Sequence, residues 1–143
     1  MAQLPAKGID ISEFNGDVDL EALKGQVDFV IIRCGYGSDI DSQDDVQFAN
    51  NVRKCEAAGI PWGTYLYSYA QNTDMARSEA AHTLRLLQGR RPAYGVWYDV
   101  EDSSLPAGEA LVDNVVAYCQ AVEQAGLYVG VYSFLYWMQT RLN

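Results

Sequence analysis

Two acidic residues, Asp99 and Glu101, stand two positions apart where the apolar run AYGVWYDVE ends. Side chains alternate along a strand, so Trp97, Asp99 and Glu101 should share one face, while the residues between them point the other way. The two carboxyl groups would lie about 6 to 7 Å apart at the backbone. In a site poor in water they cannot both ionise freely, so the pKa of one should rise. Such a pair offers a neutral acid beside an ionised base, as acid/base catalysis requires.

Polar and aromatic side chains also occur in the other apolar runs. Asp10 in GIDIS lies on the face opposite the isoleucines, and an aspartate inside a barrel is costly unless it is partnered or catalytic. Arg33 ends the second run, and its planar guanidinium could hold a carboxylate in place. Tyr65 and Tyr67 share a face of the third run, offering flat surfaces of the kind that stack on sugar rings, and Tyr132 lies near the end of the fifth.

Each of these features also has an ordinary structural explanation. A D-x-E at a strand end is more often a helix N-cap or a solvated exit, and alternating tyrosines are more often core packing. An arginine at a strand end is as often part of a structural ion pair as a ligand clamp. The single histidine, His82, falls in a helical segment, and we assign it no role. Convergence favours the functional explanation, because the carboxyl ends of parallel strands share one mouth in a barrel.

The elements that must position these residues follow from the hydrophobic pattern. Apolar, β-branched runs alternate with segments of helical period, which predicts βαβ units around a parallel sheet. The predicted strands span residues 8 to 12, 28 to 35, 61 to 69, 93 to 101 and 127 to 133. The predicted helices span about 19 to 25, 45 to 58, 74 to 88 and 107 to 125, and the tail FLYWMQTRLN could begin a fifth. Gly25, Gly59, Gly89 and Gly126 follow these helices, where a left-handed cap residue is favoured.

Parallel strands buried on both faces can form an open doubly wound sheet or a closed barrel. The stretch RCGYGS is not followed by a helix and carries no Lys-Ser/Thr, which argues against a phosphate-binding loop. The case for an open doubly wound sheet is weaker for the same reason. Polar residues at the carboxyl ends of several strands favour a barrel. We therefore predict an α/β fold of the TIM-like (βα) barrel class, in one domain over residues 1 to 143.

Composition excludes several classes of function. The net charge is −9 and the 10 basic residues are scattered, which argues against binding to nucleic acid. No run approaches the roughly 20 apolar residues of a membrane span, and the N-terminus lacks a basic region followed by an apolar one. We expect a soluble protein without a secretory signal or membrane insertion. Cys34, Cys55 and Cys119 form an odd set without metal-ligand spacing, so we predict buried free thiols, as in a reducing compartment.

Four ordered motifs resemble one family. KGIDISEFNGDVD resembles the opening strand of glycoside hydrolase family 25, the Chalaropsis-type lysozymes or N-acetylmuramidases. FVIIRCGYGS is similar to that family's second strand, and FANNVRKCEAAGIPWGTYLYSYA to its second helix and third strand. VWYDVED resembles its catalytic D-x-E strand, and AYCQAVEQAGLYVGVYS continues the match. The resemblance covers essentially all 143 residues.

This resemblance implies hydrolysis of the β-1,4 bond between N-acetylmuramic acid and N-acetylglucosamine in peptidoglycan, with no cofactor or metal. Glu101 would be the general acid and later the base, and Asp99 would orient the substrate's N-acetyl group, whose oxygen acts as internal nucleophile. Asp10 would support this pair. Retaining catalysis by a substrate's own acetamido group is a recognised exception to the two-carboxylate scheme. The residues predicted to bind the glycan are Arg33, Tyr65, Tyr67, Trp97 and Tyr132.

The family's barrel has five βα units followed by three further strands, and this sequence stops at Asn143, before those strands. We expect a C-terminally truncated barrel with an open edge, and self-association through that edge. The expected partner is the peptidoglycan glycan strand. The expected place of action is the bacterial cell wall, as a phage endolysin or a released autolysin made in the cytoplasm.

Two alternatives stay open. One is a glycan-binding remnant that has lost turnover with the missing strands. The other is a phosphate-processing barrel in which Asp99 and Glu101 hold Mg²⁺. Activity that survives EDTA would exclude the second.

Overall fold

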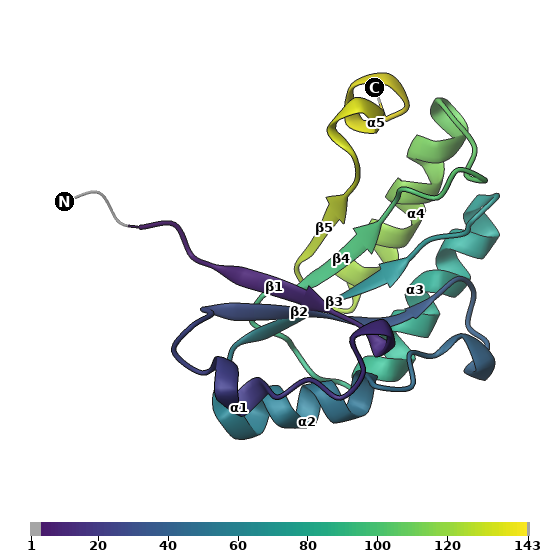
Figure 1. Cartoon of the computed structure of the whole chain (residues 1–143). Helices are drawn as coiled ribbons and strands as arrows, with labels where there is room; N and C mark the ends of the chain where they lie inside the picture. The colour runs from purple at the N-terminus through teal and green to yellow at the C-terminus, as the bar shows by residue number, and fades with distance from the viewer. Residues whose placement is uncertain (1–3, 143) are drawn as a thin grey trace.

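The computed structural model describes residues 4–142, in which parallel strands alternate with helices (Figure 1). The strands are β1 (Gly8–Ile11), β2 (Phe29–Tyr36), β3 (Trp62–Tyr67), β4 (Val96–Asp99) and β5 (Val129–Tyr132). The helices are α1 (Leu20–Leu23), α2 (Phe48–Ala58), α3 (Thr73–Leu87), α4 (Glu109–Gln124) and α5 (Leu135–Thr140), with short 3-10 turns at Glu13–Asn15 and Asp41–Gln43. Every predicted element is confirmed to within a few residues at its ends. None of the helices in this described part is long and apolar enough to cross a membrane.

The strands form one sheet in the order β1-β2-β3-β4-β5, and each neighbouring pair is parallel. A strand order that follows the chain is the pattern of successive βα units around a barrel. In a doubly wound sheet the order of the strands would instead reverse at a switch point. The register shifts once, between Arg33 and Gly35 of β2. Strands β1 and β5 form the two edges of the sheet.

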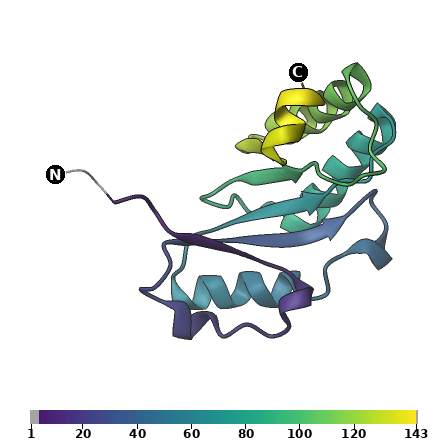
Figure 2. The same ribbon diagram turned by 45° about the horizontal axis from the view of Figure 1, so that its top comes forward.

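Helices α2, α3 and α4 pack along one face of this sheet. Helix α2 contacts β2, α3 contacts β2 and β3, and α4 contacts β4 and β5. The views of Figures 1 and 2 show these helices on the outer side of the twisted sheet, with α5 standing beyond the end of β5. Each βα unit therefore places a helix over the strands beside it, as expected for a barrel segment.

The two faces of the sheet differ in burial. The side chains that face the helices are fully or almost fully buried: Val30, Ile32, Leu66, Val96 and Tyr98. On the other face Ile31, Tyr65 and Trp97 are half-buried, and the side chains buried there, Arg33 and Asp99, are polar. The expectation that the strands are buried on both faces is thus wrong for residues 4–142, because no described element covers the inner face. Two cavities lie on that open face.

The amphipathic faces predicted for the helices are confirmed. In α4, Leu111, Tyr118 and Val122 are buried, and in α2, Phe48 and Val52 are. The ring of Tyr118 stacks on that of Tyr98 from β4, with centroids 3.8 Å apart and an angle of 10° between the planes. This aromatic pair fixes α4 against the strand that carries the acidic residues.

Glycine ends α2 as predicted, whereas α3 ends differently. Gly59 is the left-handed C-cap of α2, and its N–H donates to the carbonyl oxygens of Cys55 and Glu56. In α3 the left-handed cap is Gln88, with φ 51°, and Gly89 follows it. An αL conformation at a residue other than glycine is uncommon but tolerated in a single cap position.

Two of the cysteines lie inside the core. Cys34 of β2 and Cys55 of α2 are fully buried, and Cys119 of α4 is half-buried. Burial raises the pKa of the Cys34 and Cys55 thiols to about 11. Both side chains therefore act as small apolar groups in the core.

Candidate active site

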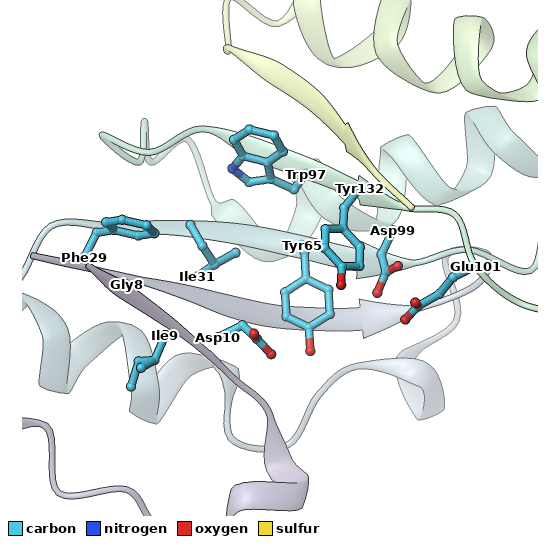
Figure 3. Close-up of a pocket in the computed structure, with 10 residues that line it drawn as sticks. All are labelled: Gly8, Ile9, Asp10, Phe29, Ile31, Tyr65, Trp97, Asp99, Glu101 and Tyr132. Atoms are coloured by element: carbon cyan, nitrogen blue, oxygen red, sulfur yellow. The ribbon is translucent and has the colours of Figure 1, made fainter. Parts of the chain in front are cut away.

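Two cavities open on the inner face of the sheet and meet at the acidic pair. The first, of ≈ 390 Å³, is lined by Gly8, Ile9, Asp10, Phe29, Ile31, Tyr65, Trp97, Asp99, Glu101 and Tyr132 (Figure 3). The second, of ≈ 540 Å³, is lined by Ser12, Glu13, Phe14, Arg33, Tyr36, Tyr65, Tyr67, Tyr69, Asp99 and Glu101. Tyr65, Asp99 and Glu101 belong to both. The two cavities therefore form one trough on the inner face, which runs from the start of β1 and β2 to the carboxyl ends of the strands, with the two acids where the cavities meet.

Asp99 and Glu101 differ in their surroundings. Asp99 is the last residue of β4 and is 5% exposed, whereas Glu101 lies beyond the strand and is half-buried. Burial, together with the negative charges of Glu101 and Asp10, raises the pKa of Asp99 to about 8. The Oδ1 atom of Asp99 is buried without a hydrogen-bond partner among residues 4–142. The prediction that one acid of the pair has a raised pKa is confirmed, and that acid is Asp99.

Asp10 lines the first cavity from β1, one of the two edge strands of the sheet. In the β1–β2 register it lies beside Ile31, and Figure 3 shows its carboxylate pointing into the same space as Tyr65. Its side chain is exposed among residues 4–142, so the cost that an aspartate would have in an interior strand does not arise there. The physical reason is that β1 is an edge strand whose inner face nothing described covers. The charge of Asp10 still acts on the site, because it helps to raise the pKa of Asp99.

Arg33 binds two carboxylates, and both come from outside the acidic pair. Its Nε donates to Asp45 at 2.8 Å and its Nη2 to Glu13 at 2.7 Å. Its guanidinium also lies over the ring of Phe14, 4.8 Å from the centroid. The side chain is 9% exposed and lines the second cavity. The structure thus shows the ion-pair explanation for Arg33, and contact with a ligand stays a prediction.

Aromatic side chains form the walls of the trough. Tyr67 donates its hydroxyl to Asp102 at 3.1 Å, and its ring lies 5.2 Å from that of Tyr69. Trp97 donates its indole N–H to the carbonyl oxygen of Tyr94 at 2.8 Å. A Cβ at Gly130 would lie 2.4 Å from the Trp97 ring, so glycine is needed beside that indole. Burial raises the pKa values of Tyr65 and Tyr67, which keeps both hydroxyls protonated.

Several residues of the trough were not predicted from the sequence. Phe29 and Ile31 of β2 line the first cavity, and their alternation with Val30 and Ile32 could have indicated this. Phe14 lines the second cavity from a 3-10 turn after β1 and is 83% exposed. No periodicity in the sequence places such a turn over β2, so only the tertiary structure could identify it.

His82 lies outside the trough, on the helix-covered side of the sheet. Its ring is fully buried in α3, with Nδ1 2.9 Å from the carbonyl oxygen of Gly37 and Nε2 2.7 Å from Asp44. Arg85 of the same helix also donates to Asp44, at 2.6 Å. These bonds connect the segment after β2 to α3. The role of His82 is therefore structural, and no functional role was predicted for it from the sequence.

With this geometry established, comparison with known proteins identifies the family. The family model described as Glycosyl hydrolases family 25 matches residues 9–143. The chain belongs to glycosyl hydrolase family 25. The resemblance seen in the four sequence motifs is therefore confirmed. A comparison with curated proteins gives no match.

Solved structures share the fold of this family 25 chain. The modular autolysin LytC of Streptococcus pneumoniae is 34% identical with a TM-score of 0.85, over 96% of this chain and 34% of LytC. The catalytic domain of endolysin ply40, from bacteriophage P40 of Listeria monocytogenes, is 23% identical with a TM-score of 0.83, over 98% of this chain and 69% of that one. A muramidase of Trichobolus zukalii is 19% identical with a TM-score of 0.79, over 96% of this chain and 70% of that one. The predicted fold class is confirmed by these similarities, and this family 25 chain spans about a third of the length of LytC.

Proposed function

We propose that this family 25 chain is a muramidase, a glycoside hydrolase that cleaves the β-1,4 bond after N-acetylmuramic acid in peptidoglycan. The observation that carries the proposal is the acidic pair at the junction of two cavities, with the pKa of Asp99 raised well above its ordinary value. A polymer lying along such a trough would present a bond between two sugars to the pair. One solved structure of LytC is described as a complex with a synthetic peptidoglycan ligand, which supports the choice of substrate.

In the first step, Glu101 donates its proton to the glycosidic oxygen, and the bond from that oxygen to the anomeric carbon breaks. The acetamido oxygen of the same sugar attacks the anomeric carbon and forms a cyclic oxazolinium intermediate. Asp99 accepts a hydrogen bond from the acetamido N–H and balances the positive charge that develops. Asp10 contributes a further negative charge from β1 at the same cavity.

In the second step, the ionised Glu101 accepts a proton from water, and the resulting oxygen nucleophile attacks the anomeric carbon. The acetamido oxygen leaves, the ring of the intermediate opens, and Glu101 is again protonated. Two displacements at one carbon restore its configuration, so the reaction proceeds with retention. The pair therefore finishes with the proton that it held at the start.

The raised pKa of Asp99 bears on where that proton resides. Without substrate, burial favours the protonated form of Asp99, because it disfavours the charged form. A substrate N–H that donates to Asp99 favours its ionised form instead. The first step needs the proton on Glu101, so we propose that substrate binding favours transfer of the proton from Asp99 to Glu101.

The walls of the trough suit a glycan. The faces of Tyr65 and Trp97 border the first cavity together with Tyr132, and Tyr67 borders the second. Flat aromatic faces with polar edges pack against the C–H surfaces of sugar rings. We propose Tyr65, Tyr67, Trp97, Tyr132 and the second-cavity wall around Arg33 as the glycan-binding surface.

The test is release of reducing ends from purified bacterial cell walls. The wild type should release them, and Glu101→Gln should lose on the order of 10² to 10⁴-fold in rate, because general acid catalysis contributes about that much. Asp99→Asn should lose a similar order, since an amide cannot balance the developing charge. Glu123→Gln is the matched control, because Glu123 is exposed on α4 and lines neither cavity. Its rate should equal that of the wild type.

Other outcomes would identify the alternatives. A protein that sediments with the walls and releases no reducing ends would be a glycan-binding module without turnover. Loss of activity in EDTA would indicate a metal-dependent reaction. Among residues 4–142, no three His, Cys, Asp or Glu side chains gather as a metal site, which favours activity that survives EDTA.

We also propose that the protein acts on the bacterial wall, as the endolysins and the autolysin that it resembles in fold are named for doing. Self-association through the edge of β5 is a second proposal. It rests on exposed apolar side chains that lie at that edge and in α5: Tyr132, Phe134, Leu135, Tyr136 and Met138.

A further inference from the structure

A carboxylate that the proposed reaction does not use lies beneath the acidic pair. Glu79 of α3 is fully buried on the helix-covered side of the sheet and lines neither cavity of the trough. Burying a charged group costs several kcal/mol unless hydrogen bonds replace the lost water. A glutamate in this position therefore needs a compensating set of donors.

Glu79 receives three hydrogen bonds. The Tyr98 hydroxyl donates to Oε2 at 2.6 Å, the Ser68 hydroxyl donates to Oε2 at 2.8 Å, and the Tyr69 N–H donates to Oε1 at 2.8 Å. Burial raises the pKa of Glu79, whereas these three donors oppose the rise by favouring the ionised form. The carboxylate is thus bound on both oxygens, by one group from β4 and two from the segment that follows β3.

Two of the three donors, Tyr98 and Ser68, are connected to Asp99. Tyr98 precedes Asp99 in β4, and its ring is held by the stack on Tyr118. Ser68 follows β3, and its N–H donates to the carbonyl oxygen of Asp99 at 2.9 Å. Glu79 is therefore connected to Asp99 in two ways. It binds the side chain of Tyr98, the residue before Asp99, and it binds the hydroxyl of Ser68, whose N–H donates to the Asp99 carbonyl oxygen.

Asp99 depends on its backbone for its position. Its buried Oδ1 has no hydrogen-bond donor among residues 4–142, so no such bond holds that end of the carboxyl group in place. The direction of the side chain is then set by the backbone of residues 98 to 100 and by packing. That backbone is the segment that Tyr98 and Ser68 connect to Glu79.

We propose that Glu79 is a positioning residue, which holds the end of β4 so that Asp99 faces Glu101 across the trough. The catalytic meaning of this role rests on the proposed muramidase function, whereas the structural coupling does not. Glu79 acts from the opposite side of the sheet and touches no substrate. The network also reaches Tyr69, whose ring lines the second cavity, so the same carboxylate orders part of the glycan wall.

The experiment compares Glu79→Leu, which removes all three acceptor contacts, with Tyr98→Phe, which removes one. The direct readout is an NMR titration of the Asp99 carboxyl carbon, which needs no substrate. In both variants the pKa of Asp99 should fall toward its ordinary value, because a loosened strand end admits water and separates the acids. Glu79→Gln should restore much of the wild-type titration, since its amide can accept from the Tyr69 N–H and donate to the two hydroxyl oxygens.

The matched control is Thr64→Val in the middle of β3. It removes a buried hydrogen bond of 2.7 Å from the Thr64 hydroxyl to the carbonyl oxygen of Ile32, which involves neither Glu79 nor its donors. This variant should lower the melting temperature and leave the Asp99 titration unchanged. The proposal is overturned if folded Tyr98→Phe titrates as the wild type does, or if Thr64→Val shifts Asp99 equally. Tyr98→Phe keeps the test decisive should Glu79→Leu not fold.

The second part of the experiment measures the rate of cell-wall hydrolysis by the same variants. In Tyr98→Phe and Glu79→Leu, kcat should fall by about 10 to 100-fold with little change in KM, because misplacement of about 1 Å costs that order of rate. A structural role alone would lower the folded fraction and leave kcat per folded molecule unchanged. If the wild type releases no reducing ends, the muramidase proposal fails, and the Asp99 titration still decides whether Glu79 positions that residue.

Discussion

At the scale of single residues, the two acids of the trough differ because one ends a strand and the other follows it. Asp99 is enclosed by neighbouring strands, whereas Glu101 lies beyond the last backbone pair of β4. Burial therefore acts mainly on Asp99 and raises its pKa, while the charge of Glu101 adds to the effect. The position of Asp99 at the end of the strand is thus the cause of its raised pKa.

This difference predicts a pH dependence of stability. The pKa of Asp99 is about 8 in the folded chain, against about 3.9 for an unfolded aspartate. The folded state therefore holds the proton more tightly, and the stability that this supplies is present below about pH 4 and lost as pH rises through 8. Asp99→Asn has no proton to lose. Relative to the wild type, its free energy of unfolding should increase between pH 4 and 8 by on the order of a few kcal/mol.

Urea unfolding at several pH values measures this difference. Asp113→Asn is the control, since Asp113 is exposed on α4, and its curve should run parallel to that of the wild type. A constant offset between Asp99→Asn and the wild type across this range would show that burial does not raise the pKa of Asp99.

At the scale of elements, Arg33 fastens the end of β2 to two neighbouring segments. Asp45, after the second 3-10 turn, accepts from Arg33 Nε at 2.8 Å, from the Glu13 N–H at 3.0 Å and from the Gln47 N–H at 2.9 Å. The Asp45 side chain is completely buried. The turn after β1, the end of β2 and the start of α2 therefore meet at one ion pair, and together they shape the second cavity.

Breaking this ion pair should be costly. Arg33→Met leaves the Asp45 carboxylate buried without its cation, so the free energy of unfolding should fall by about 3 to 5 kcal/mol. Arg77→Met removes an exposed pair with Asp74, whose side chains are 60% and 96% exposed, and should cost less than about 1 kcal/mol. Chemical denaturation of both variants gives the comparison. Equal losses would mean that the Asp45 carboxylate finds water or another donor when Arg33 is absent.

At the scale of the whole molecule, the sheet has one covered face and one open face. The helices pack on one side of β2 to β5, and the trough occupies the other side of the sheet. Strands β1 and β5 have no strand partner on their outer side within residues 4–142. Unpaired edges with exposed apolar neighbours favour contact with another chain.

The proposed self-association should therefore depend on the β5 edge. Sedimentation velocity of the wild type should show association that grows with concentration, and the double variant Phe134→Ser with Leu135→Glu should reduce it. Val46→Glu is the control, because Val46 is an exposed apolar residue just before α2, a helix that packs on β2. Monomers at every concentration, or association that the double variant leaves unchanged, would contradict the proposal.

Most of the fold could be predicted because the local patterns agree with one another. The βα alternation predicted every strand and helix, and strand alternation placed Trp97, Asp99 and Glu101 on one face, where the cavities confirm them. The exposure of Asp10 could not be predicted in this way, because it depends on what lies across the sheet. The same is true of Arg33, whose partners Glu13 and Asp45 come from turns without periodicity.

The sequence by itself determined the order of the elements, the side of each strand that carries polar groups and, through its motifs, membership of glycosyl hydrolase family 25. Those properties depend on local periodicity and on residues a few positions apart. Only the tertiary structure decided that Asp99 is the acid with the raised pKa, that Arg33 is occupied by its own chain, and that Glu79 lies beneath the pair. Burial and hydrogen bonding between distant segments set these properties, because both depend on which surfaces the folded chain brings together.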